Sequence, residues 1–181
     1  MAAPLRLSYS VVGPSVAGVW MAQETGIFKK HGLDVQLIYI PSSGTNIQAV
    51  TRDFLQKNPD TVERAVKAYI EAVGAMNNDK ETTLKVLARY FKRSDPNFLD
   101  ETYTLVTKFV EKTPRVDTRN VATVLEFEPV KGVDAETLAP KVIDNSVIDK
   151  LVKEGFIDKV FAKAGRWGFN KFALIFILTN E

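Results

Sequence analysis

The chain has 181 residues, of which 45% are hydrophobic and 25% are charged, and its formal net charge is +2. This composition is typical of one globular domain with a buried core, or at most two small ones. The small net charge, with Lys and Arg spread along the sequence, argues against a nucleic-acid partner. The absence of cysteine excludes a disulfide framework, a thiolate metal site and a cysteine nucleophile.

Neither end of the sequence predicts a membrane segment. The opening MAAPLRLSYSVVG has no basic stretch followed by a long apolar core, so we expect no signal peptide in it. The most apolar run, Phe172 to Leu178, is far shorter than the ~20 residues that a spanning helix needs. The chain as given is therefore expected to be soluble.

The first 40 residues predict a parallel βαβ unit. Residues 5–12 have a strand pattern that ends at Gly13-Pro14, and Ser15 can cap a helix over 16–25. A short turn then leads to a second strand over 33–40, which is apolar on both faces and is therefore expected to be covered on both sides. The crossover between the strands should be right-handed.

Helical patterns follow, and no strand is apparent between residues 51 and 158. Apolar residues recur at helical spacing, and Asn58, Asp95 and Asp117 stand at cap positions. The predicted helices cover residues 45–57, 58–76, 79–92, 94–112, 118–127 and 146–155. Two parallel strands need neighbours, so residues 1–50 look like the opening of an α/β domain whose remaining strands are missing.

Two loops hold the candidate ligand-binding residues. The first contains Ser10, Gly13 and Ser15, together with Pro14, and it follows the first predicted strand. The second follows the other strand and contains Ser42, Ser43, Gly44 and Thr45. Ligands of open α/β sheets bind at the carboxyl ends of the strands, where backbone N–H groups and helix N-termini favour an anion. The alternative is that both loops are ordinary capped turns, with Ser15, Ser43 or Thr45 as the cap.

The remaining chemistry-bearing residues predict no catalytic or metal site. His31 is the only histidine and is expected in an exposed turn, and Trp20 is expected in the core. One histidine without cysteine cannot form a metal centre. We find no Ser-His-Asp set, phosphate loop or dinucleotide fingerprint, so we expect no cofactor.

Residues 5–50 closely resemble the start of the substrate-binding proteins of the nitrate/sulfonate/taurine class of ABC transporters, which are similar to the thiamine-pyrimidine synthesis family. The matching pattern is W.A.E.GIF..HGLDV, then a strand, then a small polar loop with G...QA. Helices from FLQKNPD to VIDKLVKEGFIDKV look like the family's C-terminal helices. The resemblance covers about residues 4–161, with a large internal block absent near Val50–Thr51, and the tail at 162–181 does not match.

The resemblance implies a truncated lobe of the type II periplasmic-binding-protein fold over residues 1–161. Residues 1–50 would be its ligand-loop segment and residues 51–161 its helical segment. It implies a non-catalytic solute-binding component of an importer for nitrate, a sulfonate, taurine or a similar solute, with ABC permease subunits as partners and a periplasmic or extracytoplasmic location. Such proteins close two lobes around the ligand. A chain that retains one lobe would contact the ligand on one side only and is therefore expected to bind it weakly.

Two alternative functions are open. An enzyme or binding protein of thiamine-pyrimidine synthesis shares the fold, but the synthases are associated with a cysteine-rich motif that this chain lacks. A helical interaction module formed by residues 51–158 would need no small ligand.

The apolar tail is expected to affect assembly. Residues 172–178 are β-prone and uncharged. They could fill the open edge of the first strand, pair between chains, or form a helix packed on the others.

Overall fold

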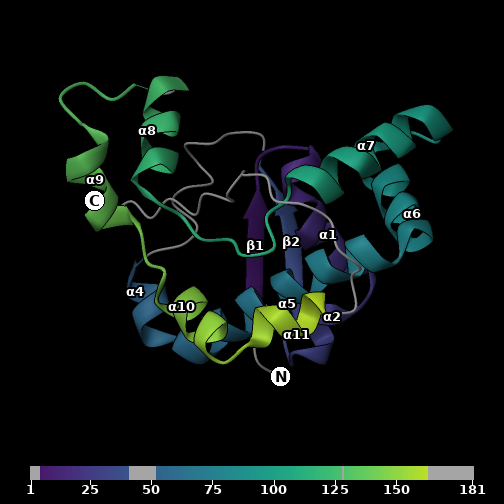
Figure 1. Cartoon of the computed structure of the whole chain (residues 1–181), viewed down its shortest axis with the longest axis horizontal. Helices are drawn as coiled ribbons and strands as arrows, with labels where there is room; N and C mark the ends of the chain where they lie inside the picture. Colours follow the sequence, from purple (N-terminus) through teal and green to yellow (C-terminus); the bar gives the residue numbers. More distant parts are fainter. Residues whose placement is uncertain (1–4, 41–51, 128, 163–181) are drawn as a thin grey trace.

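The computed structural model of the chain describes residues 5–40, 52–127 and 129–162. It is an α/β structure in which many helices surround a small parallel sheet (Figure 1). The N-terminal elements are β1 (Leu5–Tyr9), η1 (Pro14–Val16), α1 (Ala17–Glu24), α2 (Ile27–Lys30) and β2 (Val35–Tyr39). The later helices are α4 (Arg52–Lys57), α5 (Pro59–Asn78), α6 (Lys80–Phe91), α7 (Pro96–Phe109), α8 (Thr118–Phe127), α9 (Ala135–Val142), α10 (Ser146–Lys153) and α11 (Phe156–Phe161).

The predicted parallel βαβ unit is confirmed. Strands β1 and β2 pair in parallel, with a register that runs from Leu5 opposite Val35 to Tyr9 opposite Tyr39. Strand β1 is shorter than the predicted 5–12, because the chain turns away after Tyr9 and leaves Val11 and Val12 exposed. The sheet therefore ends earlier than its apolar run suggests.

One face of the sheet packs on the core. Val35 lies on that face and belongs to the buried core cluster. Leu5, Leu7 and Leu37 lie on the same face and pack against this cluster. On the opposite face the register pair Arg6 and Gln36 is exposed. On the same face Ile38 is half-buried. The predicted cover of this face is therefore not seen at the Arg6–Gln36 pair among the described residues.

The loop after β1 enters its helix differently from the prediction. Gly13 is the N-cap of the 3-10 turn η1, with Pro14 at its first position, and Ser15 lies inside that turn. Ser15 is therefore not the cap of α1, whose N-cap is Val16 without a side-chain hydrogen bond. Gly26 ends α1 as predicted, because its φ of 72° lies in the left-handed region that favours glycine.

Helix α5 is the central element of the core. It packs against α1, α2, α10 and α11, and it buries the side chains of Ile70, Val73 and Met76. Its partner α1 is buried along almost its whole length, from Ala17 to Ala22. An exposed helix that is apolar all round would be unfavourable, so α1 is stable only between the sheet and α5.

The predicted helices are largely confirmed, with differences at their ends. Asp95 caps α7, because its carboxylate accepts a hydrogen bond of 2.7 Å from the Phe98 N–H. Asn58 stands at the N-cap of α5, as predicted, but its side chain makes no capping hydrogen bond and donates to the Phe54 carbonyl at 3.0 Å. Of the predicted helix over 45–57, residues 52–57 form α4, and the rest, with the Val50–Thr51 junction, lies outside the described residues.

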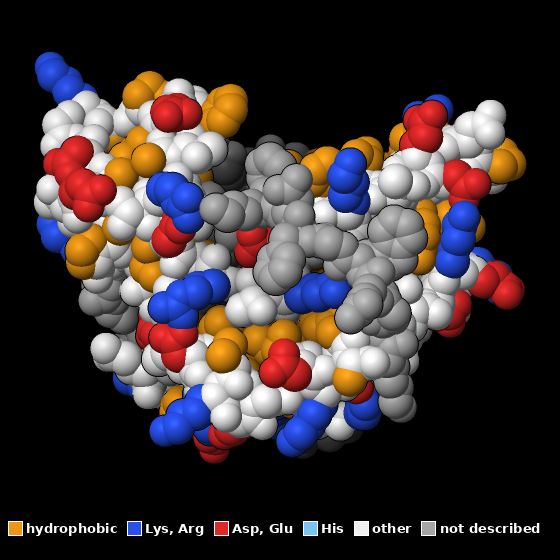
Figure 2. Space-filling model, in the orientation of Figure 1, with side chains coloured by type: hydrophobic (Ala, Val, Ile, Leu, Met, Phe, Trp, Pro, Cys, Tyr) orange, Lys and Arg blue, Asp and Glu red, His pale blue; other side chains and the backbone are white. Residues whose placement is uncertain are grey.

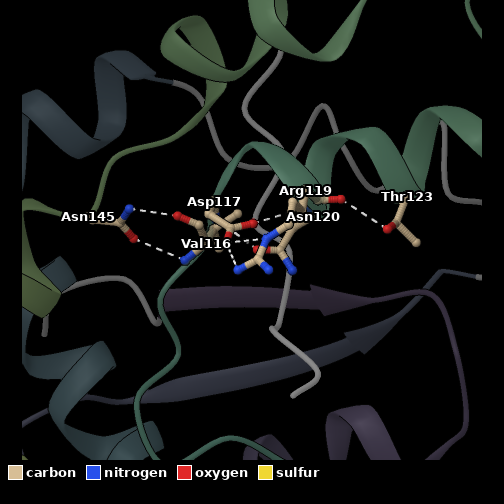
Figure 3. A network of polar contacts seen from close by, with 6 residues as sticks. All are labelled: Val116, Asp117, Arg119, Asn120, Thr123 and Asn145. Carbon is tan, nitrogen blue, oxygen red and sulfur yellow. Dashed lines mark hydrogen bonds and ion pairs between the residues drawn. The ribbon is translucent and has the colours of Figure 1, made fainter.

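Helices α8 and α9 form a separate hairpin with its own small core. Val121, Ala139 and Val142 are buried between these two helices. The hairpin is closed at its base by Asn145, whose side-chain amide donates to the Val116 carbonyl at 2.8 Å and accepts from the Val116 N–H at 3.1 Å (Figure 3). In Figure 1 the hairpin stands at one end of the molecule, and α6 and α7 stand at the other.

No helix within the described ranges is both long enough and apolar enough to cross a membrane.

Candidate functional site

The candidate site lies at the edge where both strands end. Tyr9 and Tyr39 are the last paired residues, and the Ile40 N–H donates to the Tyr9 carbonyl at 2.9 Å. Because the strands are parallel, the chain leaves both of them at this edge. The loop with Ser10, Gly13 and Ser15 therefore starts beside Ile40.

The loop after β1 is open to solvent. Val11 and Val12 are 52% and 45% exposed, Ser15 is exposed and Ser10 is half-buried. A side chain added at Gly13 would meet nothing within 4 Å. Gly13 also has an extended backbone, with φ −164°, which any residue can adopt. Neither packing nor conformation therefore requires glycine at this position.

The second candidate loop follows β2 in the sequence. Ser42, Ser43, Gly44 and Thr45 lie outside the described residues, so their predicted proximity to Ser10, Gly13 and Ser15 stays a prediction. The described part of the edge is formed by the first loop, by the end of β2 and by α7, which contacts η1.

An aromatic cluster behind the loop was not predicted from the sequence. Trp20 is fully buried, as expected, and its ring stacks on Tyr90 with centroids 4.6 Å apart. Tyr9 meets Trp20 edge-on at 6.1 Å and lies 5.4 Å from Tyr39. The sequence feature that could have indicated this cluster is the tyrosine at the last position of each strand. Tyr90 is 70 residues from Trp20 in the sequence and joins the cluster because α6 packs on α1.

Polar contacts tie this cluster to the surface. The Tyr90 hydroxyl donates to the Glu24 carboxylate at 3.0 Å, and Arg89 pairs with the same carboxylate at 2.6 Å. Burial, and then the hydrogen bond to Glu24, raise the pKa of Tyr90 well above its ordinary value. The tyrosine therefore stays neutral at physiological pH and acts as a donor rather than as a base.

The Trp20 indole N–H has no hydrogen-bond partner among the described residues. Among the described residues, its Nε1 atom is the one buried side-chain nitrogen or oxygen without a hydrogen bond. A buried donor without an acceptor costs free energy. Tyr9, Tyr90 and Phe91 surround the ring, and their aromatic faces are at best weak acceptors.

His31 lies in a turn, as predicted, but it is not exposed. Its side chain is only 15% exposed, and its Nε2 atom lies 2.7 Å from a Glu71 carboxylate oxygen. Lys30 pairs with the other oxygen of the same carboxylate. This cluster joins α2 to α5 at the amino end of β2, so it lies away from the candidate edge. The described residues contain no group of His, Cys, Asp and Glu that could hold a metal ion.

The Glu71 cluster predicts an acid-sensitive contribution to stability. Burial alone would raise the pKa of Glu71, but the hydrogen bonds and charges of Lys30 and His31 outweigh it and hold that pKa below its ordinary value of 4.5. A carboxylate whose pKa is lowered in the folded state stabilises the fold at pH values above its ordinary pKa. This stabilisation is lost as the pH falls through the folded-state pKa. Glu71→Gln should therefore lower the free energy of unfolding by about 1 kcal/mol at pH 7, and by much less at pH 3.

Urea unfolding at the two pH values measures this effect. The matched control is Glu81→Gln, which removes a similar pair with Lys85 in which both side chains are more than 70% exposed. Such surface pairs contribute little, so the control should leave stability nearly unchanged. An equal loss for Glu71→Gln at pH 3 and pH 7 would show that the effect is not electrostatic.

We compared the whole chain with known proteins. No protein-family model, no curated protein and no solved structure matches it.

Proposed function

We propose that the chain is the solute-binding component of an ABC importer for a small anionic or organic solute, such as nitrate, a sulfonate or taurine. The proposal rests on the resemblance of residues 5–50 and on one structural observation. That observation is the open loop from Ser10 to Ser15, which follows β1 at the edge where β2 also ends. The solute would be passed to permease subunits in an extracytoplasmic compartment, without chemistry on it.

In this proposal the loop binds the solute through short-range donors. Backbone N–H groups and the hydroxyls of Ser10 and Ser15 would face an anionic group. Ser42, Ser43, Gly44 and Thr45 follow Ile40 directly in the sequence, so we assign them to the same site. The type II periplasmic-binding-protein fold belongs to the same proposal, with this chain as one partial lobe.

Gly13 gives the proposal a sharp test. Gly13→Ala adds a methyl group where there is free space and where the backbone is already extended. The free energy of unfolding should therefore change by less than about 0.5 kcal/mol. A methyl group in the path of a solute that approaches the backbone should weaken binding by about tenfold.

Isothermal titration calorimetry measures the affinity, with nitrate, taurine, aliphatic sulfonates and pyrimidine precursors as solutes. We expect a Kd on the order of 1 mM for one class, because a single wall leaves much of the solute in water. Ser10→Ala should weaken that binding too. Ser146→Ala, which removes an exposed hydroxyl on α10, should leave it unchanged.

The outcomes separate the candidate functions. Binding of only the pyrimidine precursors would favour the thiamine-pyrimidine alternative. Absence of heat with every solute, from a chain that is folded by circular dichroism, would contradict a solute-binding role and favour the helical interaction module.

A further inference from the structure

The α8–α9 hairpin carries an exposed apolar tip. Phe127 is 81% exposed, and Val130 and Val133, in the connection to α9, are 56% and 39% exposed. We call these three residues the α8–α9 tip. Figure 2 shows hydrophobic side chains at this end of the molecule, with both acidic and basic side chains around them. An aromatic side chain and two valines left together in water are typical of a surface that another segment covers.

The hairpin presents this tip away from the main core. Its small core of Val121, Ala139 and Val142 is separate from the cluster around α5. The Asn145 amide closes the base by holding the backbone of Val116, and Asp117 caps α8 there by accepting from the Asn120 N–H at 3.2 Å (Figure 3). Phe127 ends α8, so it lies at the opposite end of that helix from the clamp.

The tip has an acidic surround. Glu126 precedes Phe127, and Asp134 and Glu136 follow Val133. Their side chains are exposed, and Lys131 is the one cation among the described residues from 126 to 136. Hydrogen bonds from the backbone and then the side chain of Thr137 hold the pKa of Asp134 below its ordinary value, so this carboxylate stays charged. An apolar patch inside this surround fits an apolar segment that follows basic residues.

The C-terminal segment of this chain has that composition. Residues 172–178, FALIFIL, contain no polar or charged side chain. The preceding residues 163–171 contain Lys163, Arg166 and Lys171 and no acidic residue. Ten residue steps separate Ala162, the last described residue, from Phe172, and an extended chain of that length reaches about 33 Å. A compact domain of this size has a radius of gyration of about 16 Å and is therefore roughly 40 Å across, so the tether spans much of that diameter.

We propose that residues 172–178 dock within the same chain on the α8–α9 tip, and that the basic residues before them pair with its acidic surround. The sheet edge is the less suitable acceptor, because neither β1 nor β2 contains Asp or Glu and Arg6 is exposed on β1. A second copy is also less favourable. A tethered segment has an effective concentration in the millimolar range, far above the micromolar concentration of separate chains.

Disulfide trapping tests the docking in the full chain. The chain has no cysteine, so a disulfide can form only between two introduced residues. The test variant is Val130→Cys with Ile175→Cys. Two matched variants place the first cysteine at valines of similar exposure: Val152→Cys, 51% exposed on α10, and Val11→Cys, 52% exposed beside the sheet edge.

We expect the Val130 variant to form an intrachain disulfide about tenfold faster than either matched variant under mild oxidation. Non-reducing electrophoresis with light scattering distinguishes a cross-linked monomer from a dimer. Adding Phe127→Asp to the Val130 variant should slow the reaction by about tenfold, because a carboxylate replaces the apolar anchor. Replacing Arg166 and Lys171 with Glu should slow it as well, and high salt should reduce that difference.

Three results would overturn the proposal. Equal rates at the three valines would show that the tail has no preferred site. Fastest trapping at Val11 would assign the tail to the sheet edge. A disulfide-linked dimer as the main product of the Val130 variant would assign the tip to a second copy. The three cysteine sites are exposed, and circular dichroism of each reduced variant verifies that the fold is intact before oxidation.

Discussion

Replacing Trp20 with alanine will lower the free energy of unfolding by about 3–5 kcal/mol, the usual cost of truncating a fully buried large aromatic residue. Trp20 is 0% exposed and contacts three aromatic rings from β1 and α6. Its removal would leave a cavity between the sheet and α6 and would also remove the stacking with Tyr90. For a chain of this size the loss corresponds to a fall in Tm of about 6–20 °C.

A second substitution separates the ring from the indole nitrogen. Trp20→Phe keeps an aromatic ring and removes the unpartnered Nε1–H. Loss of an unsatisfied donor is favourable, so Trp20→Phe should cost less than half as much as Trp20→Ala. If Trp20→Phe and Trp20→Ala lower the free energy of unfolding equally, the size of the cavity does not set the loss. The indole N–H would then make a hydrogen bond that both variants remove.

Urea unfolding followed by far-ultraviolet circular dichroism measures both variants, because the signal does not depend on tryptophan fluorescence. The control is Val152→Ala on α10, where 51% of the side chain is exposed, and it should change stability by less than about 0.5 kcal/mol. A loss below 1 kcal/mol for Trp20→Ala would contradict the packing of α6 on α1.

The fold was predictable where the physical signal is local. Helices α7 and α8 have an Asp immediately before them and apolar residues at helical spacing, and the structure confirms both. Helix α9 was missed because Pro140 lies inside it and proline normally ends a helix pattern. Among the described residues, its buried side chains are Ala139 and Val142, which pack with Val121 of α8.

Long-range contacts at the site were not predictable in the same way. The parallel pairing of β1 and β2 follows from the order of the elements, so the shared edge could be inferred. The Glu71 partner of His31 is 40 residues away, and Tyr90 is 70 residues from Trp20. No periodicity connects residues on different helices, so the sequence predicted an exposed His31 and no aromatic cluster.

Gly18→Ala should lower the free energy of unfolding by up to about 2 kcal/mol, although alanine is the better helix former. Gly18 lies in α1 where this helix crosses α5. An added Cβ would lie 2.7 Å from the Tyr69 Cε2 atom and 3.1 Å from the Val73 Cγ2 atom. Overpacking of a tight core costs about 1–3 kcal/mol, and the gain in helix propensity offsets about 1 kcal/mol of it.

Repeating Gly18→Ala in a chain that lacks the Tyr69 ring tests whether this close contact causes the loss of stability. Tyr69→Leu removes the ring edge that the new methyl group would meet. In that background Gly18→Ala should become neutral or stabilising, which is the coupling expected of residues in contact. Gly13→Ala is the matched control, since nothing lies within 4 Å of its added Cβ, and it should be neutral in both backgrounds. Thermal and urea unfolding of the four chains complete the cycle. An equal cost for Gly18→Ala with Tyr69 and with Leu at position 69 would show that α1 and α5 do not meet at this ring.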